Sequence, residues 1–348
     1  MRPASAIIGL LFALVTTACA DESASSTTTA AVTTSTGGTT TTVGPVQAPE
    51  EPFRGFSLSP VDYEGNSLVE FLETAAANGE AIERVGDILE WEEPPNSGLA
   101  AVDGLAAEYG YLSLSITGVF NVDDGVLLRP IDDETFDRYV AAARTYAASH
   151  QPPYLGLGVE IDTQWRVRPQ DFDRFAELFA AVAAAVDEVS PDTEMFTSFQ
   201  LERLSGMLGG LFGGVSDPEL ALWTLIDRFP DADIIAFTTY PGLVFTDPAE
   251  IPDDYYSRLN DYAGGRRIAF TEMGWQSAGE YGAYSGSEEK QLAFVTRFHE
   301  LIEDADVAFY IWSFLYDQQV QGPFASMGLV DRALRPKAAW WEWQSQGG

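Results

Sequence analysis

The sequence predicts one (β/α)8 barrel, a closed ring of eight parallel strands with helices around it, over residues 53–348. Two observations lead to this fold class. Short apolar runs alternate eight times with segments of helical periodicity, which is typical of a parallel sheet covered by helices. No GxGxxG or Walker-type glycine loop follows the first run, so the usual reason to prefer an open doubly wound sheet is missing.

The expected strands are continuous apolar runs bounded by turn residues, as in parallel strands that are buried on both faces. They are Phe53–Ser59, Ala81–Trp91, Tyr111–Phe120, Tyr154–Ile161, Glu194–Leu201, Asp233–Tyr240, Arg267–Met273 and Val307–Leu315. Barrel enzymes build their active sites at the C-terminal ends of the strands, so the residues that close each run are the candidate site.

The segments between these runs carry apolar residues at three- and four-residue spacing, as helices packed on a sheet do. The clearest is Pro169–Val189, which begins with a proline and ends at Ser190-Pro191. Another is Ser287–Glu303, and Leu334–Trp343 completes a set of eight expected helices.

The first 19 residues predict an export signal, because Ile7–Val15 is a short unbroken run of small and apolar residues. That run is too short to span a bilayer, which needs about 20 residues. Thr16–Cys19 resembles the lipobox of bacterial lipoproteins, in which the cysteine is lipidated, although Thr replaces the usual Leu at its start. The alternative is an ordinary signal peptide cut near Ala18 or Ala20. The lipoprotein interpretation anchors Cys19 to the outer face of the cell membrane, and both interpretations predict export.

Residues 20–52 predict a disordered linker between this leader and the barrel. From Ser23 to Thr42, 14 of 20 residues are Ser or Thr. Such a segment buries too little apolar area to offset the entropy of ordering it. We therefore expect a globular domain that is held at the cell surface by a lipid anchor and a flexible stalk.

The chain carries 19 basic and 53 acidic residues, a net charge of −34. This surface repels nucleic acid and anionic membranes, so membrane contact is expected only through the lipid. The two histidines, His150 and His299, lie in helical segments away from the strand ends. They leave no Ser-His-Asp set and no histidine metal cluster. Carboxylate catalysis is the chemistry that remains, and we expect a monomer without a metal or a cofactor.

Two of the expected strands close with a glutamate, Glu160 in the fourth and Glu272 in the seventh. A carboxylate at the end of a buried strand costs free energy unless it is paired, hydrogen-bonded or open to a cavity. This placement makes the two glutamates the candidate catalytic carboxylates. A structural alternative is that Glu160 caps a neighbouring helix or pairs with an arginine.

These strand ends resemble those of glycoside hydrolase clan A, in which glutamates closing strands four and seven carry out the reaction. The run Thr271–Trp275 is similar to the clan's nucleophile strand. Tyr240, closing strand six, matches a tyrosine that touches the nucleophile, and Trp312 matches a strand-eight tryptophan that floors the sugar site. The tail at residues 328–340 is also similar. Within the clan, the galactan-degrading endo-hydrolases are one candidate relative.

One position departs from the clan's pattern. The clan usually carries Asn before the strand-four glutamate, where it contacts the sugar 2-hydroxyl, and this chain has Val159. Asp162, Gln164 and Gln200 are candidates to replace that contact; alternatively the sugar differs there, or the barrel only binds glycans. Clan arginines hold the nucleophile's oxygens, and Arg84 in the second expected strand is the candidate for that role.

Glycosidic cleavage passes through an oxocarbenium-like state, so a protonated carboxyl donates to the leaving oxygen while an ionised one attacks. The resemblance assigns the acid/base role to Glu160 and the nucleophile role to Glu272, which implies a retaining reaction. The proton donor needs a raised pKa, which an apolar setting and a like-charged neighbour supply. A carboxyl separation of about 5–5.5 Å accompanies retention, whereas about 6.5–9.5 Å leaves room for a water and accompanies inversion.

Aromatic side chains near the strand ends are candidates for binding the faces of sugar rings. Trp165 and Trp275 lie just past the two glutamates, and Trp91 closes the second expected strand among acidic residues. Core packing is the alternative for Trp312 and Tyr240, a solvated loop for Trp91, and a surface position for Trp165.

The sequence therefore predicts an extracellular glycoside hydrolase that acts on a polysaccharide or oligosaccharide. The alternative is a non-catalytic, cell-surface barrel that captures glycan. Retention of both glutamates argues against that alternative, and Val159 argues for it.

Overall fold

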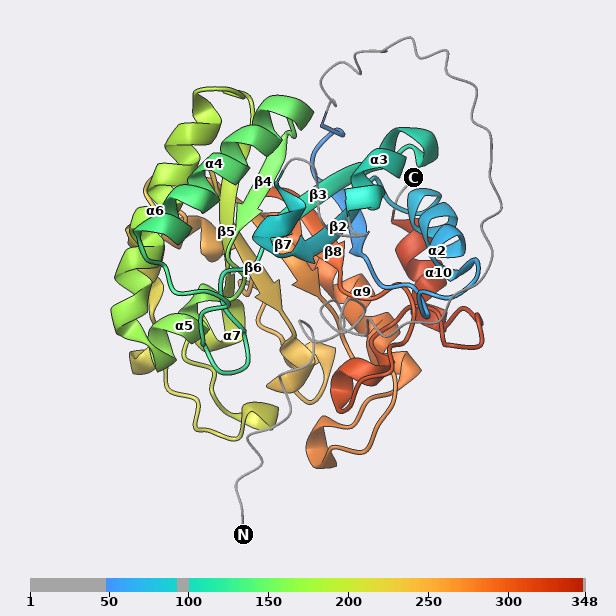
Figure 1. Ribbon diagram of the computed structural model, residues 1–348. Helices are drawn as coiled ribbons and strands as arrows, with labels where there is room; N and C mark the ends of the chain where they lie inside the picture. The colour runs from blue at the N-terminus through green and yellow to red at the C-terminus, as the bar shows by residue number, and fades with distance from the viewer. Residues whose placement is uncertain (1–47, 93–99, 347–348) are drawn as a thin grey trace, which may run out of the picture.

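The computed structural model describes residues 48–92 and 100–346. Their eight strands form a closed parallel barrel in chain order, which confirms the predicted fold class. Helices surround the ring (Figure 1). The leader and residues 20–47 of the expected linker lie outside the described residues. The strands are β1 (Phe53–Ser57), β2 (Ala81–Gly86), β3 (Leu112–Thr117), β4 (Tyr154–Leu157), β5 (Glu194–Gln200), β6 (Ile234–Thr239), β7 (Arg267–Met273) and β8 (Val307–Trp312).

Most strands are shorter than expected at their C-terminal ends. The largest difference is in β2, which ends at Gly86 and is followed by a 3-10 turn, Ile88–Glu90. Asp87 begins this turn, and its side chain accepts a hydrogen bond from the backbone N–H of Leu89. A cap of this kind diverts the backbone from the sheet. Trp91 therefore follows a turn and does not close a strand.

The helical layer is uneven around the barrel. After β5 and β6 the chain forms only short helices and 3-10 turns where full helices were expected. Five glycines between 206 and 214, and prolines at 218, 241, 248 and 252, disfavour longer helices there. The helices are α2 (Ser67–Ala76), α3 (Ala100–Tyr109), α4 (Asp133–His150), α5 (Ile161–Val167), α6 (Pro169–Asp187), α7 (Leu201–Leu204), α8 (Leu259–Tyr262), α9 (Glu288–Ile302) and α10 (Ala338–Ser345).

The three clearest helical predictions differ in accuracy. α6 and α9 match the expected segments within two residues, and Ser287 is the N-cap of α9, where it accepts from the N–H of Lys290. The last helix begins only at Ala338, later than expected, because Leu334 has a positive φ of 60° and Pro336 follows it. Both features are incompatible with a helix that starts at residue 334.

The lower part of the barrel interior is filled by aromatic rings. Phe53, Tyr154, Phe196 and Phe309 come from four different strands, and their ring centroids lie 5.4–5.6 Å apart. Strands β1 and β4 are not neighbours, so contact between Phe53 and Tyr154 shows that both rings point inward. Because side chains alternate along a strand, this set fixes which residues of each strand face the interior.

The tail of the chain is tied to the loops that follow β7 and β8 by Lys337. Its buried ammonium donates to Asp317 Oδ1 at 2.6 Å, to the carbonyl of Gly328 at 2.7 Å and to Ser277 Oγ at 2.8 Å. A buried charge is tolerated when it is paired and fully hydrogen-bonded. Lys337 is the N-cap residue of α10, so these contacts fix the start of that helix against the loops after β7 and β8.

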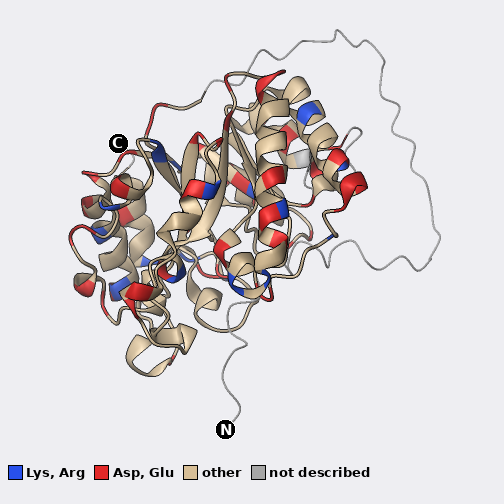
Figure 2. Cartoon of the chain, turned by 90° about the vertical axis from the view of Figure 1, so that its left-hand side faces the viewer, with Lys and Arg blue, Asp and Glu red and all other residues tan. Residues whose placement is uncertain are grey.

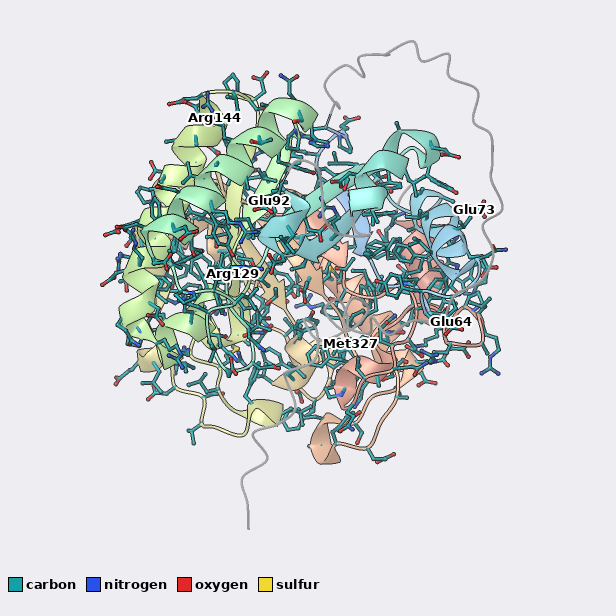
Figure 3. All side chains as sticks on the ribbon, viewed as in Figure 1. Glu64, Glu73, Glu92, Arg129, Arg144 and Met327 are labelled. Carbon is teal, nitrogen blue, oxygen red and sulfur yellow. The ribbon has the colours of Figure 1, made fainter. Side chains whose placement is uncertain are left out.

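Acidic residues are distributed over the helices on the face shown in Figure 2. Surface cations mostly pair with nearby acids: Arg144, labelled in Figure 3, pairs with Glu188, and Arg129 lies 2.8 Å from Asp87. Such exposed pairs contribute about 0–1 kcal/mol each and are not what holds the fold. Within the described ranges, no helix is long and apolar enough to cross a membrane.

The close approach of β1 and β2 gives a stability prediction. A Cβ on Gly55 would lie 2.1 Å from the carbonyl oxygen of Ala81, its partner in the ladder. We expect Gly55→Ala to destabilise the barrel by several kcal/mol, because backbone must move. Gly104→Ala, on an open face of α3 with nothing within 4 Å of its Cβ, should stabilise by up to about 1 kcal/mol. Thermal unfolding followed by circular dichroism measures both, and a small effect of Gly55→Ala would contradict the packing.

Candidate active site

A tight turn at the end of β4 presents Glu160. The strand stops at Leu157, and Gly158 adopts a positive φ of 85°. Glu160 itself has a φ of 50° and occupies the N-cap position of α5, where its side chain does not cap the helix. Non-glycine residues in this left-handed region are uncommon and occur often at functional sites. The turn therefore aims the Glu160 side chain away from the strand direction and toward the interior.

The Glu160 carboxyl has one close donor and one distant cation. Thr238 Oγ1 donates to its Oε1 at 2.7 Å, and Arg203 Nη1 lies 4.0 Å from its Oε2. Only 5% of the residue is exposed. Burial raises the pKa of Glu160, while Arg203 and the Thr238 hydrogen bond oppose the rise and Asp123 adds to it. Glu160 is thus a buried acid with a weak ion pair to Arg203. This ion pair partly matches the structural alternative, in which Glu160 pairs with an arginine.

Glu272 lies in β7 and is the acceptor of a buried tyrosine. The Tyr240 hydroxyl donates a short hydrogen bond to Glu272 Oε2 and lies 2.9 Å from Ser313 Oγ. Glu272 is 6% exposed. Burial, together with the charge of Glu160, raises the pKa of Glu272 to about 8, and the Tyr240 hydrogen bond opposes this rise. The contact between Tyr240 and Glu272 is the one that the family resemblance implies.

The two glutamates belong to one site. Thr238, which donates to Glu160, is paired with Glu272 in the ladder between β6 and β7, just after a register shift in that ladder. The charges of the two carboxyls also interact directly. Thr238 therefore lies beside two residues that are 112 positions apart in sequence: its side chain donates to Glu160, and its backbone neighbours Glu272 in the ladder. This role of Thr238 was not predicted, because threonine in an apolar strand carries no distinctive signal.

A third carboxyl, Glu83 of β2, faces the same interior and was also missed. Its side chain is fully buried, Ser57 Oγ is 3.4 Å from its Oε1, and its Oε2 has no hydrogen-bond partner. Burial raises the pKa of Glu83 well above its ordinary value, and the charge of Glu272 raises it further. At the level where the resemblance leads one to expect an arginine, this chain therefore places an acid.

Arg84 points the other way and does not reach Glu272. Its guanidinium donates to Asp103 of α3, with Nε 2.8 Å from Oδ1, and lies 3.5 Å from Glu90. Consecutive residues of a strand face opposite sides of the sheet, so Arg84 is in the helical layer because Glu83 is inside. The expected arginine contact with the nucleophile is thus replaced by a structural ion pair outside the barrel.

The tryptophans expected at the sugar site are mostly buried outside the barrel. Trp312 packs against Trp343 of α10, with ring centroids 5.9 Å apart, and does not floor the mouth. Trp275 packs on Phe294 of α9, and Trp91 donates to Ser115 beside α4. Both are almost fully buried. The indole rings of Trp312, Trp275 and Trp91 all face the surrounding helices, because their positions in the strand or turn point the side chain away from the barrel interior.

The remaining expected contacts have different placements. Trp165 is half-buried against the main core. Gln200 caps α7 by accepting from the N–H of Arg203 at 2.7 Å, so its amide is already used. Asp162 accepts from the N–H of Gln200 at 2.8 Å, and burial raises its pKa to about 7. Gln164 is fully buried without a hydrogen-bond partner for its amide.

Apolar side chains surround Tyr240 on the outer side of the site. Leu243, Phe314, Phe324 and Met327 form a cluster separate from the main core, with Phe324 edge-on to the Tyr240 ring at 5.0 Å. These residues come from the loops after β6 and β8. Met327 is labelled in Figure 3. These buried apolar side chains shield the Tyr240 ring, whose hydroxyl donates to Glu272, from solvent.

Over residues 48–92 and 100–346, no group of three or more His, Cys, Asp or Glu side chains is arranged to hold a metal ion. The polar groups described at the site are carboxyls, hydroxyls and one guanidinium. Burial raises the pKa of the carboxyls of Glu83, Glu160 and Glu272; the charge of Glu160 raises that of Glu272 further, and the charge of Glu272 raises that of Glu83. With a pKa of about 8, Glu272 keeps a proton at neutral pH.

No protein-family model matches the sequence, and no curated protein matches it. The fold, however, is similar to solved glycosidases. The exo-β-1,4-mannosidase Op5Man5 from Opitutaceae bacterium strain TAV5 is 15% identical, with a TM-score of 0.59 over 84% of this chain and 58% of that one. A β-glucuronidase from Ruminococcus gnavus is 17% identical, with a TM-score of 0.56 over 84% and 49%.

A family 39 glycoside hydrolase from Bacteroides cellulosilyticus WH2 is 15% identical, with a TM-score of 0.56 over 84% of this chain and 62% of that one. The chain thus spans 49–62% of the length of these three structures. At such identities the likeness shows the fold alone: this chain and these glycosidases share a (β/α)8 barrel.

The raised pKa of Glu272 predicts how stability depends on pH. The folded protein keeps a proton up to pH about 8, whereas the unfolded chain loses it near the ordinary value of 4.5, so this group makes stability fall as pH rises between them. The loss is at most about 1.4 kcal/mol per pH unit. Glu272→Gln keeps an acceptor for Tyr240 and removes this pH-dependent loss of stability. The free energy of unfolding in urea, compared between Glu272→Gln and wild type, should therefore shift in favour of the variant from pH 5 to pH 8.

The control is Glu73→Gln, on the exposed face of α2 and labelled in Figure 3. It should leave the difference from wild type flat over the same range. A flat difference for Glu272→Gln as well would mean that Glu272 ionises normally in the folded protein.

Proposed function

We propose that this protein is a glycoside hydrolase in which Glu160 and Glu272 are the reacting pair. The observation that carries the proposal is a pair of buried, electrostatically coupled carboxyls, Glu160 in the turn after β4 and Glu272 in β7, with Thr238 donating to the first and Tyr240 to the second. A pair of carboxyls at the C-terminal end of the barrel is what cleavage of a glycosidic bond requires. The names of the similar structures, a mannosidase, a β-glucuronidase and a family 39 glycoside hydrolase, support a carbohydrate substrate.

In the first step the ionised Glu272 attacks the anomeric carbon, and the bond to the leaving oxygen breaks. That oxygen takes the proton of Glu160, so the pair ends with a glycosyl ester on Glu272 and a carboxylate on Glu160. In the second step Glu160 takes a proton from water as the water oxygen attacks the same carbon, which releases Glu272. The configuration is retained because the carbon is inverted twice.

The reaction needs one proton on the pair, and the electrostatics of the site supply it. Burial raises the pKa of both carboxyls, so the pair keeps a proton at neutral pH. Positive charge at the anomeric carbon favours ionised Glu272 in the transition state, which directs the proton to Glu160. The Tyr240 hydroxyl supports the same distribution, because its hydrogen bond to Glu272 favours the ionised carboxylate and opposes the rise of its pKa.

Substitution of the pair tests the mechanism once a substrate is found among β-mannan, β-galactan and β-glucuronide substrates. Glu272→Gln should abolish turnover. Glu160→Gln should slow natural substrates by about 10²–10⁴-fold but affect aryl glycosides with good leaving groups far less. Wild-type kcat/KM should fall above pH about 8, where the pair loses its last proton. Product anomers observed by NMR report retention.

Azide provides the matched control, because it replaces the water that Glu160 activates. It should restore Glu160→Gln on aryl glycosides, yielding a glycosyl azide, and should not restore Glu272→Gln through the same product. Equal tolerance of both substitutions would remove the pair from the mechanism.

A glycan-binding barrel without turnover is the second candidate. Two observations favour it: Val159 stands where the clan usually has Asn, and Glu83 rather than an arginine faces Glu272. This candidate predicts that wild type and Glu272→Gln bind the same glycan with equal affinity while neither releases reducing ends.

We further propose that the protein is exported and anchored through Cys19 to the outer face of the cell membrane. The sequence of the leader supports this, since the single cysteine of the chain follows a short apolar run. A strongly acidic barrel on a Ser/Thr-rich stalk then meets extracellular glycan rather than the anionic membrane surface.

Metabolic labelling with a fatty acid tests the anchor. Wild type should take up label and remain with the membrane, and Cys19→Ala should lose both properties. Cys19→Ser is the matched control, since it keeps size and polarity but has no thiol to modify. Label on all three proteins would refute the anchor and leave export open.

A further inference from the structure

Glu202 is a fully buried carboxylate outside the reacting pair. It lies in the first turn of α7, two residues after β5 ends. Four groups donate to it, and all are uncharged. The donors are Thr239 Oγ1 at 2.8 Å, Tyr255 hydroxyl at 3.0 Å, the backbone N–H of Tyr240 at 3.2 Å from both oxygens, and the amide of Gln200.

The donor that matters for the site is the backbone N–H of Tyr240. The ladder between β6 and β7 ends at Thr239, so Tyr240 lies one residue beyond strand pairing. A 3-10 turn, Pro241–Leu243, begins immediately after it. Glu202 therefore fixes the main chain just beyond the last paired residue of the sheet. Both of its carboxylate oxygens accept from the backbone N–H of Tyr240.

The same residue carries the hydroxyl that meets Glu272. The Tyr240 ring extends from the fixed main chain, rests edge-on against Phe324, and donates to Glu272 Oε2. A tyrosine side chain has two rotatable bonds, so anchoring its backbone and its ring leaves the hydroxyl little freedom. A continuous set of contacts thus runs from Glu202 through Tyr240 to Glu272.

A carboxylate is required at this place by the number of donors. Two ionised oxygens accept several hydrogen bonds, whereas the amide of glutamine has one acceptor oxygen and an NH2 group that would face other donors. Burial raises the pKa of Glu202, and the bonds from Thr239, Tyr240 and Tyr255 oppose that rise. The donors favour the ionised form that holds Tyr240.

We propose that Glu202 is a positioning residue for glycosidic cleavage: it holds Tyr240 so that the tyrosine hydroxyl meets Glu272. This assignment rests on the proposed function. The sequence did not indicate it, because Glu202 stands in a short polar segment after a strand and resembles a surface residue.

A double-mutant cycle of Glu202→Gln and Tyr240→Phe tests the assignment. Each single change should lower kcat by about 10- to 100-fold, with KM changed less, because the hydroxyl is misplaced or missing. Each should also raise the pKa of Glu272, by about one unit for Tyr240→Phe, since a hydrogen bond to the ionised form is lost. In the Tyr240→Phe background, Glu202→Gln should add little to either effect.

The Glu272 titration is read from the ¹³Cδ signal that disappears in Glu272→Gln, so it needs no turnover. The matched control is Glu194→Gln, at the other end of β5, where the carboxylate pairs with Arg267. It should leave the Glu272 titration unchanged. If Glu202→Gln does not fold, Thr239→Val removes one of the anchoring donors with little change of shape and should show a smaller effect in the same direction.

Full additivity of the two changes, or an unchanged Glu272 titration in Glu202→Gln, would overturn the positioning role even if wild type hydrolyses glycosides. Absence of turnover in wild type would instead refute the proposed function, and the titration cycle would still decide whether Glu202 acts through Tyr240.

Discussion

Carboxyl groups buried without a full complement of cations are the constraint on which the rest of this structure depends. Glu83, Glu160 and Glu272 face the upper interior of one barrel, and Arg203, 4.0 Å from Glu160, is the cation paired with this set in the described part of the chain. Ionised carboxylates in such a setting repel each other and lose hydration. The protein meets this cost with neutral hydroxyl donors and with bound protons.

This solution links stability and chemistry. Donors such as Thr238 and Tyr240 favour charge on particular oxygens without supplying a counter-charge, so the pKa values stay high and protons remain available at neutral pH. An arginine against Glu272 would stabilise the fold and hold that carboxyl ionised, as the resemblance to clan A implies. Here Glu83 faces Glu272, and the charge on Glu272 depends more heavily on Tyr240. The anchoring of Tyr240 by Glu202 gains its importance from this arrangement.

The similar glycosidase structures share the barrel and less than a fifth of the sequence. A fold can persist at such distance because its interior needs only alternating side chains of suitable volume. The site is less tolerant, and Val159 and Glu83 are the positions at which this chain departs from the pattern that the resemblance implies.

The sequence by itself determined the barrel, its strand order, and the placing of Glu160, Glu272 and Tyr240 at one end of it. Parallel strands that close into a ring must bring their C-terminal ends together, so residues that close different runs converge whatever lies between them. The long helices followed from apolar spacing, whereas the glycine-rich segment after β5 did not form the expected helix.

Only the tertiary structure decided which side of the barrel wall each residue occupies. Strands buried on both faces are apolar throughout, so the two-residue alternation is hidden in the sequence and a shift of one position reverses every side chain. That is why Glu83 rather than Arg84 meets Glu272, and why Trp312 packs on α10 while Ser313 meets Tyr240. Glu202 required the structure for a related reason, since its role depends on a backbone N–H that becomes available only where the ladder ends.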